Sequence, residues 1–183
     1  MVSGELECCS PHPSLLAPKT LVLQIAITNE QTLHAVDEDR LRRAVRAILE
    51  EESGRSAKVS VAIVDDGTIH RLNREFLQHD CPTDVLSFVL DETETTLEGE
   101  IIASADTAAE SAARFGWNAG DELLLYIIHG ALHLVGYDDQ EPTALVEMRA
   151  RERHYLASFG LTPRYDALEE QTAVGPSDRQ NDE

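Results

Sequence analysis

Positive charge is scarce in this chain of 183 residues, which carries 15 Lys and Arg against 34 Asp and Glu and has a formal net charge of −19. Proteins that coat nucleic acids are usually basic, because contacts with phosphate dominate their affinity. The charge balance therefore argues against a general nucleic-acid coat protein. An enzyme of this composition that acts on a nucleic acid would need local positive potential, or a partner that presents the substrate.

Long hydrophobic runs are absent as well, since no apolar stretch approaches the roughly 20 residues that span a bilayer. The N-terminus, MVSGELECCS, has acidic residues and no basic segment, unlike a secretory signal. The three cysteines are Cys8, Cys9 and Cys81, and none has CxxC spacing. An odd number without that spacing is typical of a reducing compartment and argues against a structural zinc knuckle. We therefore expect a cytoplasmic protein that makes no membrane contact.

The remaining composition, 42% hydrophobic and 27% charged residues, is ordinary for a soluble domain with a sizeable core. Residues 1–18 contain three prolines and no hydrophobic period, and residues 163–183 are polar and acidic. We expect a flexible N-terminal tail and a disordered C-terminal tail around a single catalytic domain at residues 19–162.

The hydrophobic pattern within this domain predicts a small mixed sheet packed against helices. Strands are expected at 21–28, 58–64, 85–90 and 100–104, and helices at 37–51, 68–77, 105–115, 121–136 and 141–159. Thr68 and Asp121 are the expected N-caps of two of these helices, and residues 91–98 are expected to form an acidic loop. The fold class is therefore α+β, with about four strands and about five helices.

His129 and His133 stand four residues apart in the segment HGALHLVGYDD. This spacing puts both imidazoles on one face of a helix, within reach of one metal ion. The overlapping segment LLLYIIHGALHLV is apolar on almost every side, which predicts a buried central helix in which both rings need polar partners. Gly136 is suited to ending that helix, so the chain can turn back and offer Asp138 or Asp139 as a third ligand. Two histidines and one carboxylate form a known set of catalytic zinc ligands.

The same segment resembles the HGxLHLxGYDH signature of the YbeY-type endoribonucleases, the bacterial rRNA maturation factors. Two further blocks are similar and occur in the family's order, LNREFLQHDCPTDVLSF at residues 72–88 and GEIIAS at residues 99–104. The resemblance covers roughly residues 20–160 of the chain. It implies a metal-dependent endoribonuclease, specific for single-stranded RNA, that acts in rRNA maturation and ribosome quality control. It also implies rRNA, the ribosome or a ribosomal protein as partners.

The resemblance implies one Zn²⁺ per chain, or another divalent transition metal, held by His129 and His133 as catalytic ligands. Asp139 stands where the family has its third histidine, and it becomes the third ligand here. A carboxylate ligand leaves the ion with a net charge of about +1, so bound water should be less acidic than in a three-histidine site. The same change makes the site more hospitable to harder ions such as Mn²⁺.

A second departure concerns substrate binding. Leu77 follows Phe76 where the family usually carries an arginine, and arginine is the natural clamp for a phosphodiester. Arg71 and Arg74 lie in the same predicted helix and are the candidates to bind substrate instead. The alternative is that both are solvated surface charges.

Two other functions stay open on the sequence alone. Peptidases with an HExxH motif use the glutamate after the first histidine as their base, and Gly130 at that position disfavours a zinc peptidase. A non-catalytic ribosome-assembly factor, which binds a ribosomal protein or rRNA, is favoured by the acidity of the chain and by Leu77. No residue is assigned as a general base, and Glu100 is a candidate to accept a hydrogen bond from a ligand histidine.

Overall fold

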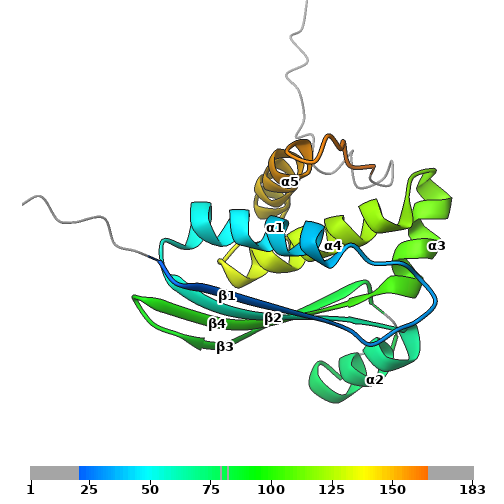
Figure 1. Ribbon diagram of the computed structural model, residues 1–183, viewed down its shortest axis with the longest axis horizontal. Coiled ribbons are helices and arrows are strands. Elements are labelled where there is room, and N and C mark those ends of the chain that lie inside the picture. The colour runs from blue at the N-terminus through cyan, green and yellow to red at the C-terminus, as the bar shows by residue number, and fades with distance from the viewer. Residues whose placement is uncertain (1–20, 79, 82, 165–183) are drawn as a thin grey trace, which may run out of the picture.

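The computed structural model describes residues 21–78, 80–81 and 83–164 (Figure 1). Of the tails expected at residues 1–18 and 163–183, only residues 163 and 164 belong to this part of the chain. The division into two tails and one domain therefore stays a prediction. The element order is β1 (Leu23–Asn29), α1 (Glu38–Ile48), η1 (Leu49–Ser53, a π-helical turn), β2 (Ser56–Val64), α2 (Asp66–Phe76), β3 (Val85–Glu92), β4 (Thr96–Ser104), α3 (Ala105–Phe115), α4 (Ala119–Leu134) and α5 (Pro142–Ala157).

The described strands form one four-stranded sheet in the order β1-β2-β4-β3. β1 pairs with β2 and β2 with β4 in parallel, whereas β3 pairs with β4 in the antiparallel sense at an edge of the sheet. Figure 1 shows α1 and α4 over one face of the sheet, α2 under the other, and α5 outside α4. This mixed sheet with its helices confirms the predicted α+β fold.

Helix α4 is the centre of the packing. It contacts β3 and β4 on one side and α1, α3 and α5 on the others. Nearly every residue from Glu122 to Leu134 is therefore buried, which confirms the predicted buried central helix. A smaller cluster under the opposite sheet face joins α2 to the sheet through Val64, Ile69, Leu86 and Ile102. None of the described helices combines the length and the apolar character needed to cross a membrane.

The prediction of an acidic loop at residues 91–98 is wrong. β3 continues to Glu92 and β4 begins at Thr96, so a tight turn joins two strands, and the Thr93 hydroxyl accepts hydrogen bonds from the Thr95 and Thr96 amides at 3.2 and 3.0 Å. Asp91, Glu92 and Glu94 are exposed, and Glu98, which is half-buried, pairs with Lys58 at 2.5 Å. A prediction based on hydrophobic alternation misses this part of the hairpin, because its strand ends carry solvated charges instead of apolar side chains.

Two helix starts also differ from the prediction. Asp65, not Thr68, is the N-cap of α2, and its carboxylate accepts a hydrogen bond from the Thr68 amide at 2.7 Å. Asn118, not Asp121, is the N-cap of α4, where its side chain accepts from the Gly120 amide at 2.7 Å. In both cases the true cap lies three residues before the expected one, because the expected residue already belongs to the first helical turn.

A candidate metal centre at the end of helix α4

The structure brings His129, His133 and Asp139 together. His129 and His133 project from one face of α4, and their Nε2 atoms lie 3.0 Å apart. The helix ends at Leu134, and Gly136 takes a φ of 101°, a left-handed conformation that reverses the chain direction. The returning segment places the Asp139 carboxylate 3.5 Å from His129 Nε2 and 3.9 Å from His133 Nε2.

Asp138, the alternative third ligand, has a different role in the structure. Its side chain is exposed, and Oδ1 accepts hydrogen bonds from the Asp139 amide at 2.8 Å and from the Gln140 amide at 3.4 Å. Asp138 therefore stabilises the turn that carries Asp139, and Asp139 is the carboxylate that faces the histidines. Its role as a metal ligand stays a prediction.

Each histidine is held through its other ring nitrogen. His133 Nδ1 lies 2.9 Å from the backbone carbonyl of Tyr137, and His129 Nδ1 lies 2.7 Å from the carboxylate of Glu152. A carbonyl and an ionised carboxylate can only accept hydrogen bonds, so both Nδ1 atoms carry the proton. In the neutral rings both Nε2 atoms are then bare and face the Asp139 carboxylate.

This donor set fits a metal ion. Electron-rich atoms with no proton between them repel one another, and a cation or an added proton removes the repulsion. Burial alone would lower the pKa of His129, but the hydrogen bond and charge of Glu152 prevail and raise it. Burial and the neighbouring His129 charge lower the pKa of His133.

The distances agree with the same conclusion. The three candidate ligand atoms lie within 4.8 Å of one another. Bonds of about 2.0–2.2 Å from a metal to nitrogen or oxygen ligands need ligand atoms separated by about 3–4 Å. Three protein ligands also leave a coordination position for water or substrate, as in catalytic zinc sites.

Glu152 is the site residue that the sequence analysis missed. It comes from α5, and Arg149 one turn earlier donates to its two oxygens at 2.9 and 3.2 Å. The candidate for this role, Glu100, lies elsewhere: Gly99 and Ile101 face α4, so Glu100 between them points to the opposite face of the sheet. The charged segment RARERHYL gives no sign in the sequence that Glu152 is buried.

Gly130 is the contact point between α4 and the sheet. A Cβ at this position would lie 2.8 Å from Ser87 Oγ and 2.9 Å from Ile101 Cγ2. The side chain of the glutamate that serves as base in HExxH peptidases would therefore collide with the sheet. The site therefore has no room for the catalytic glutamate of an HExxH peptidase, which argues against the peptidase alternative.

A cleft of about 670 Å³ opens beside the candidate metal centre. It is lined by Asp66, Thr83, Asp84, Thr107, Glu110, Ser111, Arg114, Phe115, Glu122, Leu125, Tyr126, His129, Asp139, Arg149, Glu152 and Arg164. The wall is mostly polar and carries both signs of charge. A volume of this size exceeds what a metal ion and its water require, and it leaves room for a substrate.

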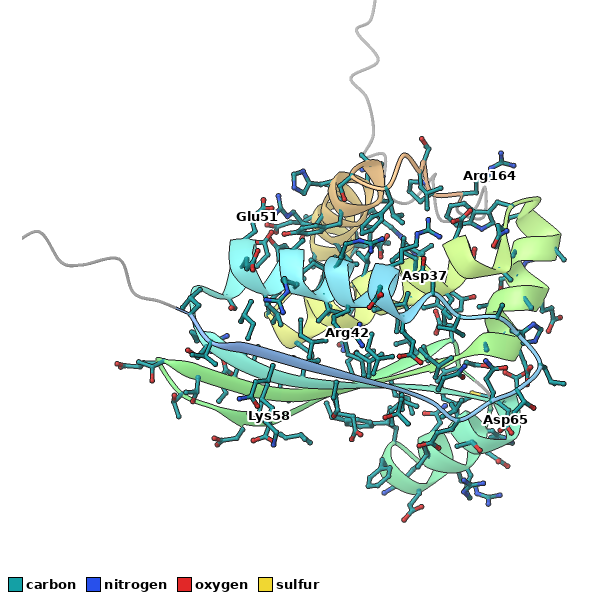
Figure 2. All side chains as sticks on the ribbon, viewed as in Figure 1. Asp37, Arg42, Glu51, Lys58, Asp65 and Arg164 are labelled. Carbon is teal, nitrogen blue, oxygen red and sulfur yellow. The ribbon has the colours of Figure 1, made fainter. Side chains whose placement is uncertain are left out.

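The predicted substrate-binding arginines do not line this cleft. Arg71 and Arg74 are exposed on α2, which lies under the other face of the sheet (Figure 1). Arg114 of α3, Arg149 of α5 and Arg164 line the cleft instead. Arg164, labelled in Figure 2, donates to the carbonyl of Phe115 at the end of α3 at 3.1 Å. The role of Arg71 and Arg74 in substrate binding stays a prediction.

The sequence profile described as Endoribonuclease YbeY matches residues 26–160. The chain belongs to the YbeY endoribonuclease family. Among relatives named Endoribonuclease YbeY, that of Carboxydothermus hydrogenoformans is 42% identical over 139 residues, which are 74% of this chain and 96% of that protein. That of Chlorobaculum parvum is 40% identical over 134 residues, 73% of this chain and 92% of that protein. The Rhodopirellula baltica relative is 48% identical over 105 residues, 56% of this chain and 54% of that protein.

A solved structure has a similar fold. The solution structure of TM1509 from Thermotoga maritima superimposes with a TM-score of 0.53 at 27% sequence identity. The match covers 75% of this chain and 92% of the Thermotoga protein. The fold that carries the candidate metal centre is therefore shared with a protein whose structure has been solved.

Proposed function

We propose that this protein is a metal-dependent endoribonuclease that cleaves single-stranded RNA in rRNA maturation and ribosome quality control. The observation that carries the proposal is the convergence of His129, His133 and Asp139 beside an open cleft, in a member of the YbeY family. The reaction takes place in the cytoplasm, with the ribosome or a ribosomal protein as the partner that presents the RNA.

The proposed ion is Zn²⁺, one per chain, with Mn²⁺ as an accepted substitute because Asp139 is a hard oxygen ligand. When bound, the ion lowers the pKa of its water and stabilises negative charge on the phosphate. The protein residues orient the ligands: Glu152 fixes the ring of His129, and the Tyr137 carbonyl fixes that of His133.

The substrate phosphates are proposed to lie along the arginines of the cleft. Arg114, Arg149 and Arg164 are the arginines of the cleft, which is also lined by the carboxylates of Asp66, Asp84, Glu110, Glu122, Asp139 and Glu152. Guanidinium groups bind phosphate oxygens through paired hydrogen bonds and are suited to an RNA backbone. Arg71 and Arg74 are proposed to act only on RNA that continues past the cleft.

One observation favours a second candidate function, a non-catalytic assembly factor. Phe76 and Leu77 are 59% and 46% exposed at the end of α2, where a family arginine would otherwise stand. Exposed apolar side chains of this kind are typical of a protein contact rather than of phosphate binding. In this case the metal would stabilise the structure, and RNA would be bound without cleavage.

A nuclease assay separates the two functions. The metal-loaded protein is incubated with a labelled single-stranded RNA and with the matching duplex, beside the His133→Ala variant purified in the same way. We expect cleavage of the single strand by the unmodified protein and its loss in the variant. Cleavage that persists in His133→Ala points to a contaminating nuclease, and a metal-loaded protein that leaves RNA intact supports the assembly factor.

A further inference from the structure

Helix α5 carries a carboxylate in a position where packing alone favours an apolar side chain. Glu152 is 0% exposed and shares the buried face of α5 with Met148, Tyr155 and Leu156. Residues spaced by four lie in one row along a helix, so Glu152 stands between Met148 and Leu156. An ionised carboxylate is costly to bury unless hydrogen bonds and an opposite charge compensate it.

Both forms of compensation are present, and the hydrogen bond leads to the candidate metal centre. Oε1 of Glu152 lies 2.7 Å from His129 Nδ1. Arg149 donates to Oε2 at 2.9 Å and to Oε1 at 3.2 Å, so it supplies the opposite charge. An ion pair three residues apart on a helix needs no burial, because its partners meet equally well on the surface. The Arg149–Glu152 ion pair therefore does not explain why Glu152 is buried, whereas its contact with His129 does.

We propose that Glu152 is a positioning residue for the metal centre. It keeps the proton of His129 on Nδ1 and fixes the ring, so that Nε2 is bare and faces Asp139 and His133. Without this acceptor the ring can rotate, or it can carry its proton on Nε2, which blocks coordination. The proposal rests on the metal site of the proposed function, but it does not depend on the substrate.

Metal affinity gives the first test. Zn²⁺ binding is measured by competition with a chromophoric chelator for the unmodified protein, Glu152→Gln and Glu147→Gln. The amide introduced by Glu152→Gln keeps the size of the side chain, but it has no charge and can donate as well as accept. We expect Glu152→Gln to bind Zn²⁺ about 10- to 100-fold more weakly. Glu147→Gln is the matched control, because it makes the same change at an exposed position of α5 and should leave the affinity unchanged.

The protonation state of His129 gives a second test that does not require the Glu152→Gln variant to fold. Long-range ¹H–¹⁵N spectra of the Zn²⁺-loaded unmodified protein should show His129 with a proton on Nδ1 and with Nε2 bound to the metal.

Glu152→Asp, which keeps the charge on a shorter side chain, should recover part of the Zn²⁺ affinity lost in Glu152→Gln.

Two results would overturn the proposal: His129 bound through Nδ1, or a Zn²⁺ affinity of Glu152→Gln within about twofold of the unmodified protein. An unmodified protein that binds no Zn²⁺ would overturn it together with the metal centre. Zinc that is bound by the unmodified protein and weakened in Glu152→Gln supports the role of Glu152 whether or not RNA is cleaved. Failure of the proposed function, seen as absent RNA cleavage, can therefore be distinguished from failure of this proposal, seen in the Zn²⁺ affinity.

Discussion

The hydroxyl of Tyr137 donates a hydrogen bond to Glu52, 3.0 Å away and 85 residues earlier in the chain. The backbone carbonyl of the same tyrosine accepts from His133 Nδ1. Glu52 also binds Arg151 and the hydroxyl of Tyr155, the latter at 2.7 Å. Helix α5 therefore supports the second histidine through Glu52 and Tyr137, as it supports the first through Glu152.

Tyr137→Phe should loosen the segment that carries Asp139. Burial raises the pKa of the Tyr137 hydroxyl, so it stays protonated and able to donate, and the variant removes this donor. We expect a loss of about 1 kcal/mol in the free energy of unfolding and at most about a fivefold weaker Zn²⁺ affinity. Urea unfolding and chelator competition measure the two effects.

Tyr155→Phe is the matched control for this prediction. Burial raises the pKa of Tyr155 to about 12, so it too acts as a donor to Glu52, and its hydroxyl bonds Glu52 and Arg151 rather than the segment that carries Asp139. We expect a similar loss of stability with a smaller effect on Zn²⁺ affinity, because Arg151 still holds Glu52 in place. Equal effects of both variants on affinity would argue against a specific role of Tyr137.

Gly130→Ala should destabilise the fold. The added methyl group would meet Ser87 Oγ at 2.8 Å and Ile101 Cγ2 at 2.9 Å, so α4 or the sheet must shift. Overpacking of this kind costs about 1–3 kcal/mol, measurable by urea unfolding. Gly67→Ala in α2 is the control, because its methyl group would meet only Asp65 Oδ1 at 3.6 Å. A Gly130→Ala protein as stable as Gly67→Ala would contradict the close packing.

The grouping of the three candidate metal ligands was predictable from the sequence because their arrangement is local. Helical spacing sets the distance between His129 and His133, and one glycine turn brings Asp139 back to them. Glu152 was not predictable, because its burial depends on how α5 packs on α4. The end of the β3–β4 hairpin was missed for a third reason: β3 is an edge strand, which tolerates exposed charged residues, and Asp91 and Glu92 at its end show no apolar alternation.

Asp139→His tests the electrostatic consequence of the carboxylate ligand. A third histidine in place of Asp139 restores the family pattern and leaves the bound ion with its full double charge. Water on such an ion is more acidic, so the rise of RNA cleavage with pH should move to lower pH in the variant. The pH profile of cleavage, measured with metal in excess, checks this. An unchanged profile, or a shift to higher pH, would speak against the assignment of Asp139 as a ligand.

Asp65→Ala tests the N-cap of α2 through pH. Hydrogen bonds from the backbone and side chain of Thr68 hold the pKa of Asp65 below its usual range. A carboxyl group whose pKa is lowered by folding stabilises the fold above its unfolded pKa and loses this effect as pH falls through the folded value. The variant should be less stable at about pH 7, and the difference should shrink below about pH 3.

Urea unfolding of the unmodified protein, Asp65→Ala and Asp65→Asn across this pH range measures the effect. Asparagine caps helices without a charge, so Asp65→Asn should keep most of the stability and lose the pH dependence that comes from this site. A difference between the unmodified protein and Asp65→Ala that stays constant with pH would show that the cap does not act through the ionised carboxylate.

The central claim is that His129, His133 and Asp139 together bind a catalytic metal ion. Its most direct test is the metal content of tag-free protein purified without chelator, measured by elemental mass spectrometry beside Asp139→Ala. The account predicts about one zinc or other transition metal ion per chain, lost in the variant. A metal-free protein that also refuses added metal, or a variant that keeps the ion in full, would contradict it.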